Sequence, residues 1–142
     1  MVQKTLIRRL EKLEKSLAQL SVNSFIEKNR TNKLFRPKDI TILYPDVTTR
    51  QITDLAERKI VKPAVETSGE GVPRLYDMKG VFDIIVSSSL RGILKPADVK
   101  KFIKKYRDEK DCATVKINRC VSISLDIKEL IDIVGKKTKG EA

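Results

Sequence analysis

Hydrophobic residues recur every three or four positions over most of the chain, which is the spacing of one face of an α-helix. The pattern predicts helices that begin near Pro37, Thr48, Asp77 and Pro96, each with an apolar stripe directed toward a common core. The expected buried positions are Ile40, Leu43, Tyr44, Ile52, Leu55, Ala56, Met78, Val81, Phe82, Ile85, Val86, Leu90, Ile93, Val99, Phe102, Ile103 and Tyr106. The middle of the chain is therefore expected to be mainly helical.

The second of these helices has the most complete start signal. Thr48 and Gln51 have the spacing of a capping box, in which each side chain bonds the backbone N–H of the other residue. Val47 and Ile52 can form the hydrophobic staple that accompanies such a cap. The outward face then consists of Thr49, Arg50, Thr53, Asp54 and Glu57. We expect this helix to end at Lys59.

Two extended segments after this helix predict a β-hairpin. The first begins at residues 60–61 and the second is residues 72–76, with a glycine-containing tip at 67–71 between them. Alternation along the second segment places Arg74 and Tyr76 on the same strand face. These two side chains are therefore expected on the surface of the hairpin.

A second hairpin is predicted near the end of the chain, where apolar and polar residues alternate at 115–117 and 121–125. A three-residue loop at 118–120 brings Val115 opposite Ile123 and keeps both apolar sets on one face, whereas a two-residue turn would split them. We therefore prefer the longer loop.

A final helix is predicted to begin at Asp126 with Glu129 and to end at Gly135. Its expected buried stripe is Ile127, Leu130, Ile131 and Val134. Two strands and one helix are too few to be stable alone. This unit is expected to pack on the preceding domain or on the same unit of a second chain.

Leucines with a 3.5-residue period predict an amphipathic helix at the beginning of the chain. They are Leu6, Leu10, Leu13, Leu17 and Leu20. This is the seam of a coiled coil, in which Arg9 and Glu14 could form an interchain ion pair. Only about two heptads are present, so the alternative is a helix that packs on its own domain. Residues 23–33 are expected to end this helix and to form a linker.

Composition makes a polyanion the first partner to consider, although a basic surface that is simply solvated would have the same composition. Thirty Lys and Arg against nineteen Asp and Glu give a formal net charge of +11. The chain contains no histidine, which is the commonest general base and metal ligand, and no glycine-rich nucleotide-binding motif. We therefore expect no enzyme and no cofactor, and no small-molecule effector is evident from the sequence. No apolar run approaches the ~20 residues of a membrane span, and a cytoplasmic protein with reduced thiols is expected.

Three motifs in the middle of the chain, taken together, resemble the winged helix-turn-helix of the MerR family of bacterial transcription regulators. They are VTTRQI at 47–52, KIVKP at 59–63 and PRLYDMKGV at 73–81, and the resemblance covers about residues 36–110. The family usually has Arg-Tyr-Tyr-Glu within the recognition helix, where this chain has TDLAE at 53–57. The family also pairs through a long C-terminal helix, which this chain lacks, so its dimer should differ.

The resemblance implies a mostly α fold with small β elements, namely a winged helix-turn-helix with an added N-terminal helix and a C-terminal hairpin plus helix. The implied function is sequence-specific binding of double-stranded DNA by a dimeric, nucleoid-associated transcription regulator. The expected DNA-binding residues are Thr49, Arg50, Thr53, Arg74, Tyr76, Lys38 and Arg36. The alternatives are an architectural or chromosome-segregation protein that coats DNA, a phage-type excisionase-like factor, and a protein-interaction adaptor.

The expected organisation has four parts. Residues 1–30 form the amphipathic helix that could pair as a coiled coil, and residues 35–110 form the DNA-binding domain. Residues 111–135 form the accessory or dimerisation unit, and residues 136–142 form a basic tail.

Copper-type members of the MerR family bind metal through a Cys-x7-Cys loop, and Cys112 and Cys120 have that spacing. Val115 and Ile117, however, belong to the predicted strand between them. An extended strand would hold the two thiols more than about 15 Å apart. We therefore expect no metal site.

Overall fold

The computed structural model describes residues 21–29, 33–66 and 73–138 of the chain. This part contains six helices and one two-stranded antiparallel sheet, and about half of it is helical. The elements are α2 (Val22–Lys28), α3 (Pro37–Leu43), α4 (Thr49–Glu57), α5 (Met78–Leu90), α6 (Pro96–Tyr106), β1 (Cys112–Lys116), β2 (Ser122–Asp126) and α7 (Ile127–Thr138). The expected helices and small β elements are both present, in a mixed fold with less helix than the mostly α fold predicted from the sequence. None of the described helices is long and apolar enough to cross a membrane.

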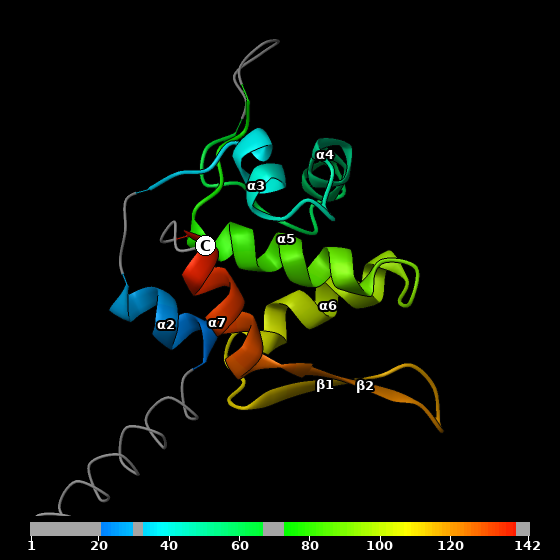
Figure 1. Cartoon of the computed structure of the whole chain (residues 1–142). Coiled ribbons are helices and arrows are strands. Elements are labelled where there is room, and N and C mark those ends of the chain that lie inside the picture. The colour runs from blue at the N-terminus through cyan, green and yellow to red at the C-terminus, as the bar shows by residue number, and fades with distance from the viewer. Residues whose placement is uncertain (1–20, 30–32, 67–72, 139–142) are drawn as a thin grey trace, which may run out of the picture.

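Helix α5 is the centre of the fold. It runs across the middle of the molecule, with α3 and α4 above it and α2, α6, α7 and the sheet below it (Figure 1). Its first turn is capped by the Asp77 carboxylate, which accepts a hydrogen bond of 2.9 Å from the Gly80 N–H. The apolar side chains that it buries are Val81, Phe82, Ile84, Val86 and Leu90. Because α5 is buried on several sides, it acts as the support for the other helices.

Helices α3 and α4 form a contacting pair joined by a short turn. Pro37 is the first residue of α3, where a missing N–H costs little. The capping box of α4 is confirmed, because the Thr48 N–H donates to Gln51 Oε1 at 3.1 Å and the Gln51 N–H donates to Thr48 Oγ1 at 3.2 Å. The helix ends at Glu57, two residues earlier than expected, and Lys59 takes a left-handed conformation with φ of 59°.

The hairpin after α4 is reduced to isolated bridges in the described residues. Val65 pairs with Leu75, and Phe35 pairs with Tyr76 on the other side. The Val65 N–H donates to the Leu75 carbonyl at 3.0 Å, and the Leu75 N–H donates back at 2.9 Å. The expected tip at 67–71 lies outside the described residues.

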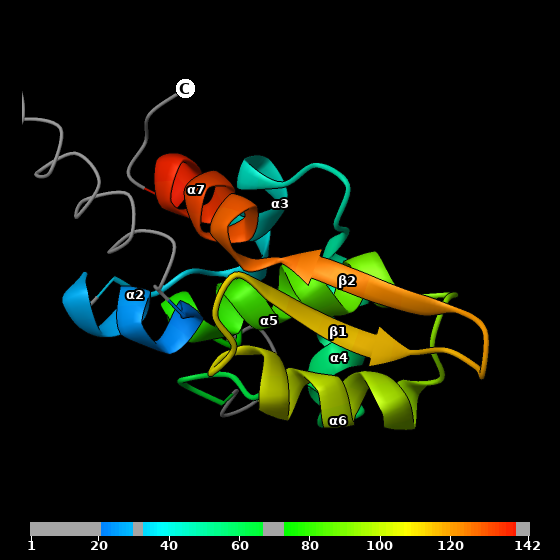
Figure 2. The same cartoon turned by 90° about the horizontal axis from the view of Figure 1, so that it is seen from below.

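The second hairpin has the predicted register. Val115 is opposite Ile123, and the Ile117 N–H donates to the Val121 carbonyl at 2.9 Å. In the three-residue loop, Asn118 Oδ1 accepts the N–H groups of Cys120 and Val121. The hairpin lies between α6 and α7 when the molecule is seen from below (Figure 2).

The last helix begins where the sequence predicts and ends later. Asp126 Oδ1 accepts the Glu129 N–H at 3.0 Å. The prediction that Gly135 ends the helix and that a tail begins at residue 136 was wrong, because α7 continues to Thr138; residues 139–142 lie outside the described residues. Gly135 is buried, and a Cβ atom there would lie 3.2 Å from the ring of Phe25. The glycine permits the close approach of α2 and α7.

Helix α2 covers Val22–Lys28, so the expectation that residues 23–33 form a helix end and a linker was wrong for residues 23–28. Ser21 has an extended backbone and its hydroxyl accepts the Ser24 N–H at 3.1 Å, which caps the first turn of α2. Val22 is fully buried, and the Phe25 ring meets Phe82 of α5 edge-on at 5.9 Å. The leucine seam at residues 6–20 lies outside the described residues.

The C-terminal unit packs on the rest of the same chain. The Ile127 N–H donates to the Asp111 carbonyl at 2.9 Å, and Ile127, Leu130 and Val134 belong to the common core. Helix α7 contacts α2, which in turn contacts α5. Of the two arrangements expected from the sequence, the structure shows packing within the chain.

Candidate nucleic-acid interface

The exposed face of α4 lines an open hollow on the surface. The residues around this hollow, which we call the α4 face, are Thr48, Thr49, Arg50, Gln51, Thr53, Asp54, Glu57, Arg58 and Arg91. All of these side chains are polar, and all except Arg91 come from α4 or its two caps. A polar surface on a firmly anchored short helix is suited to hydrogen bonding with another polar molecule.

Buried contacts fix the orientation of α4. Ile52 is fully buried and Val47 is 5% exposed, so the apolar side of the helix is anchored at its first turn. Leu55 packs against the same core one turn later. The opposite side must then face outward, which leaves Thr49 and Arg50 exposed. Thr53 donates its hydroxyl to the Thr49 carbonyl at 3.0 Å, so its oxygen is available as an acceptor.

The charges on the α4 face are mixed. Asp54 and Glu57 are acidic, while Arg50, Arg58 and Arg91 are basic. Arg58 Nε lies 3.1 Å from the Asp54 carboxylate, so the guanidinium of Arg58 partly balances the negative charge of Asp54. Arg50 makes no ion pair with any residue that the structure describes. Its guanidinium is therefore available for an external partner.

Arg58 and Arg91 belong to this face but were not predicted from the sequence. Arg58 is the C-cap of α4 and follows Asp54 by four residues. This spacing in the sequence could have predicted the ion pair between them. Arg91 is the C-cap of α5, followed by Gly92 with φ of 81°. Only the packing of α4 against α5 brings Arg91 beside α4.

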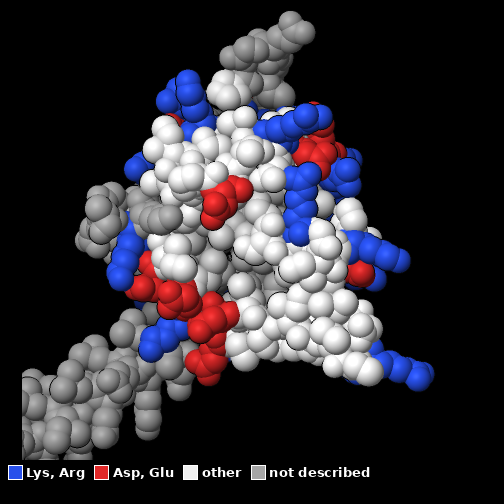
Figure 3. Space-filling model, turned by 45° about the vertical axis from the view of Figure 1, so that its right-hand side comes forward, with Lys and Arg blue, Asp and Glu red and all other residues white. Residues whose placement is uncertain are grey.

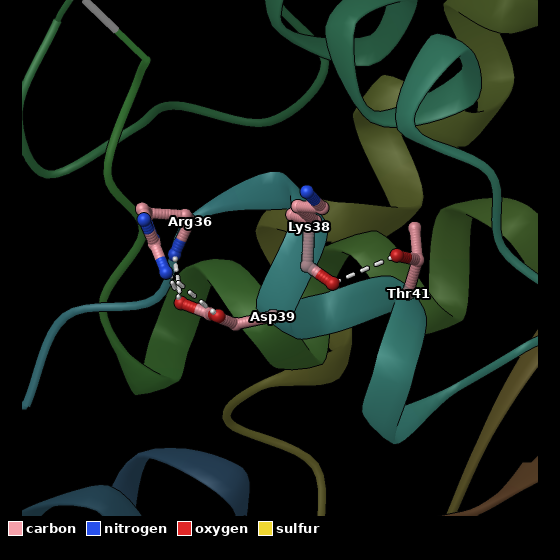
Figure 4. A network of polar contacts seen from close by, with 4 residues as sticks. All are labelled: Arg36, Lys38, Asp39 and Thr41. Carbon is pink, nitrogen blue, oxygen red and sulfur yellow. Dashed lines mark hydrogen bonds and ion pairs between the residues drawn. The ribbon is translucent and has the colours of Figure 1, made fainter.

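Arg36 and Lys38 are at the beginning of α3, and neither lines the hollow of α4. Figure 4 shows the Arg36 side chain folded onto Asp39, with Lys38 pointing away from this pair. Arg36 Nε lies 3.3 Å from Asp39 Oδ2. The pKa of Asp39 is lowered, first by the hydrogen bond from the Arg36 backbone N–H and second by that from its side chain. Lys38 is exposed, whereas the charge of Arg36 is partly balanced by its ion pair with Asp39.

Arg74 lies near the base of the first hairpin and is paired with Glu66 across it. The Arg74 side chain is 22% exposed and that of Glu66 is 62% exposed. The carboxylate thus covers part of the guanidinium. Arg74 is close to the surface, but it would have to leave or share Glu66 to bind another anion.

Tyr76 is fully buried, so the expectation that its side chain lies on the surface beside Arg74 was wrong. Its backbone N–H and carbonyl both bond to Phe35, at 2.8 and 2.7 Å, which turns its side chain toward the core. Its ring also approaches the position of a Cβ on Gly80 to 3.2 Å. Burial raises the pKa of its hydroxyl. Tyr76 is a core residue.

Cys112 and Cys120 are free and exposed. Cys112 begins β1 and pairs with Asp126, whereas Cys120 lies in the loop at the opposite end of the hairpin. Within the described ranges, no cluster of three or more metal-ligating side chains is present. The two thiols therefore lie at opposite ends of the hairpin, as the predicted strand between them required.

Charge is unevenly distributed over the surface. Figure 3 shows acidic side chains gathered at the lower left of one face, whereas basic side chains are spread around its edges, including the edge beside the acidic group. The net charge of +11 is therefore no guide to where an anion would bind.

Thr49, Arg50 and Thr53 are thus brought together on one face of α4, while Arg36, Lys38 and Arg74 lie elsewhere on the chain and Tyr76 is buried. Comparisons with protein-family models, with curated proteins and with solved structures found no match for this chain. The resemblance to MerR-type domains therefore rests on the sequence motifs alone.

Proposed function

We propose that this protein binds double-stranded DNA and that α4 is its recognition helix. The observation that carries the proposal is the α4 face, which presents Thr49 and Arg50 outward from a capped helix anchored by the buried Ile52. The major groove is wide enough to admit an α-helix, and arginine makes bidentate hydrogen bonds to guanine there. Arg50, which has no ion-pair partner among the described residues, is the residue assigned to base contact.

In this proposal α3 and α4 are the helix-turn-helix, and the segment bridged at Val65 and Leu75 is the wing. Arg74 at the base of the wing would contact the phosphate backbone after separating from Glu66. Lys38 and Arg36 at the beginning of α3 would approach a neighbouring phosphate. Such contacts fix the position of a protein on DNA, whereas base contacts carry the specificity.

The proposed role is that of a sequence-specific, dimeric transcription regulator. The leucine seam of residues 6–20 supports pairing of two chains. Two copies of α4 would then read two half-sites. The net charge of +11 supports a polyanionic partner, because phosphate contacts supply much of the affinity for DNA.

Selection of duplexes from a random pool by the full chain tests the proposal. We expect enrichment of one sequence with two related half-sites, bound at least about a thousandfold more tightly than unrelated DNA. Uniform recovery of all sequences would contradict specific binding. Genome-wide footprinting then distinguishes a regulator, which occupies a few sharp sites at promoters, from an architectural protein, which covers DNA broadly.

A protein-interaction adaptor is the second candidate, and the observation that favours it is acidic charge on α4. Glu57 is exposed on the same face as Arg50 and makes no ion pair with any described residue. A carboxylate at this position would repel phosphate and would suit a basic protein surface. If α4 binds protein, the full chain should show no preference for any duplex sequence at physiological salt.

A further inference from the structure

A second hollow, of about 400 Å³, lies between the segment that follows α4, the beginning of α5 and one side of α6. We call it the lysine hollow. Its basic residues are Lys59, Lys62, Lys79, Lys100, Lys104 and Arg107. None of the residues of the α4 face lines it. It is therefore a separate site from the proposed DNA-reading surface.

The positive charge of the lysine hollow is not balanced by its own carboxylates. The hollow contains two acids, and both are already engaged. Asp77 caps α5 through the Gly80 N–H. Asp83 is 5% exposed, accepts the Tyr106 hydroxyl at 2.6 Å and lies 3.5 Å from Arg107. No lysine of the hollow makes an ion pair with a residue that the structure describes.

The arrangement of these lysines is unfavourable in the free protein. Lys100 and Lys104 are four residues apart on α6, and like charges at that spacing repel each other. Lys59, which lines the same hollow, has a φ of 59° because it ends α4: its N–H donates to the Ala56 carbonyl, and the Ile60 N–H donates to the Leu55 carbonyl. A bound anion would relieve the repulsion.

The walls of the hollow are partly apolar. Ile103 is 3% exposed, and Ile60 and Pro63 are half-buried. A concave site of this size with apolar walls and a few charged groups is typical of small-molecule binding. A flat stripe of lysines would instead suit the backbone of a long polyanion.

We propose that the lysine hollow binds a phosphorylated small molecule of about nucleotide size. The lysines would hold the phosphate groups, and Ile60, Pro63 and Ile103 would contact a ring or another apolar part. Because Lys59 and Lys62 follow α4 directly, the ligand would link the end of α4 to α6. Phosphate groups of a DNA backbone have the same chemistry, so the experiment must separate the two sources.

Isothermal titration calorimetry of the full chain with ADP, adenosine and inorganic phosphate, at constant ionic strength, tests the proposal. We expect ADP to bind, phosphate to bind more weakly, and adenosine to give no heat. Lys100→Ala combined with Lys104→Ala should weaken ADP binding by about tenfold or more. Lys101→Ala combined with Lys105→Ala removes the same charge from the same helix outside the hollow, and should change ADP affinity by less than about twofold.

Two results would overturn the proposal. The first is no heat with ADP; if Lys100→Ala with Lys104→Ala then also causes a specific loss of DNA affinity, the hollow is assigned to the DNA backbone. The second is an equal loss of ADP affinity in the two double variants, which would indicate general electrostatic attraction. ADP binding is measured without DNA, so failure of the DNA-binding proposal would leave this result unchanged.

Discussion

The Asp54 carboxylate and the Arg58 guanidinium are paired at 3.1 Å on adjacent turns of α4, on the face that we propose reads DNA. Both side chains are about half exposed, at 47% and 55%. An exposed pair of this kind is worth less than about 1 kcal/mol. A DNA phosphate can therefore displace Asp54 from Arg58 at small cost, and the acidic residue acts as a weak competitor.

Asp54→Asn should accordingly raise the affinity for unrelated duplex DNA by a few fold, because Arg58 becomes available and one repulsive charge is lost. The dependence of affinity on salt should also become steeper. Asp132→Asn is the matched control, since Asp132 forms the same type of exposed pair with Lys136 on α7, at 3.2 Å. Fluorescence anisotropy at several salt concentrations measures the affinity and its salt dependence for both variants. Equal increases in the two variants would show that only net charge matters.

Arg74→Ala should weaken the binding of specific and unrelated DNA to a similar extent and reduce the salt slope by about one. The reason is that Arg74, on the wing, is proposed to contact phosphate and not bases. Glu66→Gln should have the opposite effect, because it releases Arg74 from its partner in the free protein. If both substitutions leave the salt slope unchanged, the wing does not contact DNA.

The buried Asp83 predicts a pH dependence of stability. Burial raises its pKa to about 7, although the hydrogen bond from Tyr106 acts in the opposite direction. An acid whose pKa is raised by folding contributes stability below its unfolded value near 4, and this contribution is lost as the pH rises to about 7. Asp83→Asn keeps an acceptor for the Tyr106 hydroxyl and removes this titration.

The difference in unfolding free energy, Asp83→Asn minus wild type, should therefore increase between pH 5 and pH 7 and level off above it. The increase is at most about 1.4 kcal/mol per pH unit. Urea denaturation at a series of pH values measures it. A difference that falls with pH would mean that the ion pair with Arg107, at 3.5 Å, outweighs the cost of burial.

The leucine seam predicts self-association. Leu10→Asn combined with Leu17→Asn should lower the mass seen in sedimentation from that of a dimer to that of one chain, because it removes two seam positions. Glu11→Asn combined with Ala18→Asn has the same seven-residue spacing outside the seam and should leave the mass unchanged. A deletion of the N-terminal segment could be used instead. It must end before residue 21, because Ser21 caps α2 and Val22 is fully buried in the core.

Local signals in the sequence predicted the elements that depend on short-range geometry. The Thr48–Gln51 capping box and the pairing of Val115 with Ile123 both follow from spacing alone, and the structure confirms both. In each case the partners lie within ten residues of each other, so no knowledge of packing was needed.

Long-range contacts account for the features that the sequence did not predict. Tyr76 is buried because Phe35, far away in the chain, pairs with it, and alternation alone placed it on the surface. Gly135 was expected to end a helix, but the approach of Phe25 explains it better. Arg91 joins the α4 face only because α5 packs against α4.

The central claim is that Arg50 reads a base from α4, and its most direct test is the affinity of Arg50→Ala for a duplex selected by the full chain. We predict a loss of about 1–3 kcal/mol on the selected site and relaxed preference at one base pair. Arg119→Ala removes an equal charge from an exposed loop distant from α4 in sequence, and should cost less than about 0.5 kcal/mol. Equal affinities of the two variants for the selected site would contradict the account.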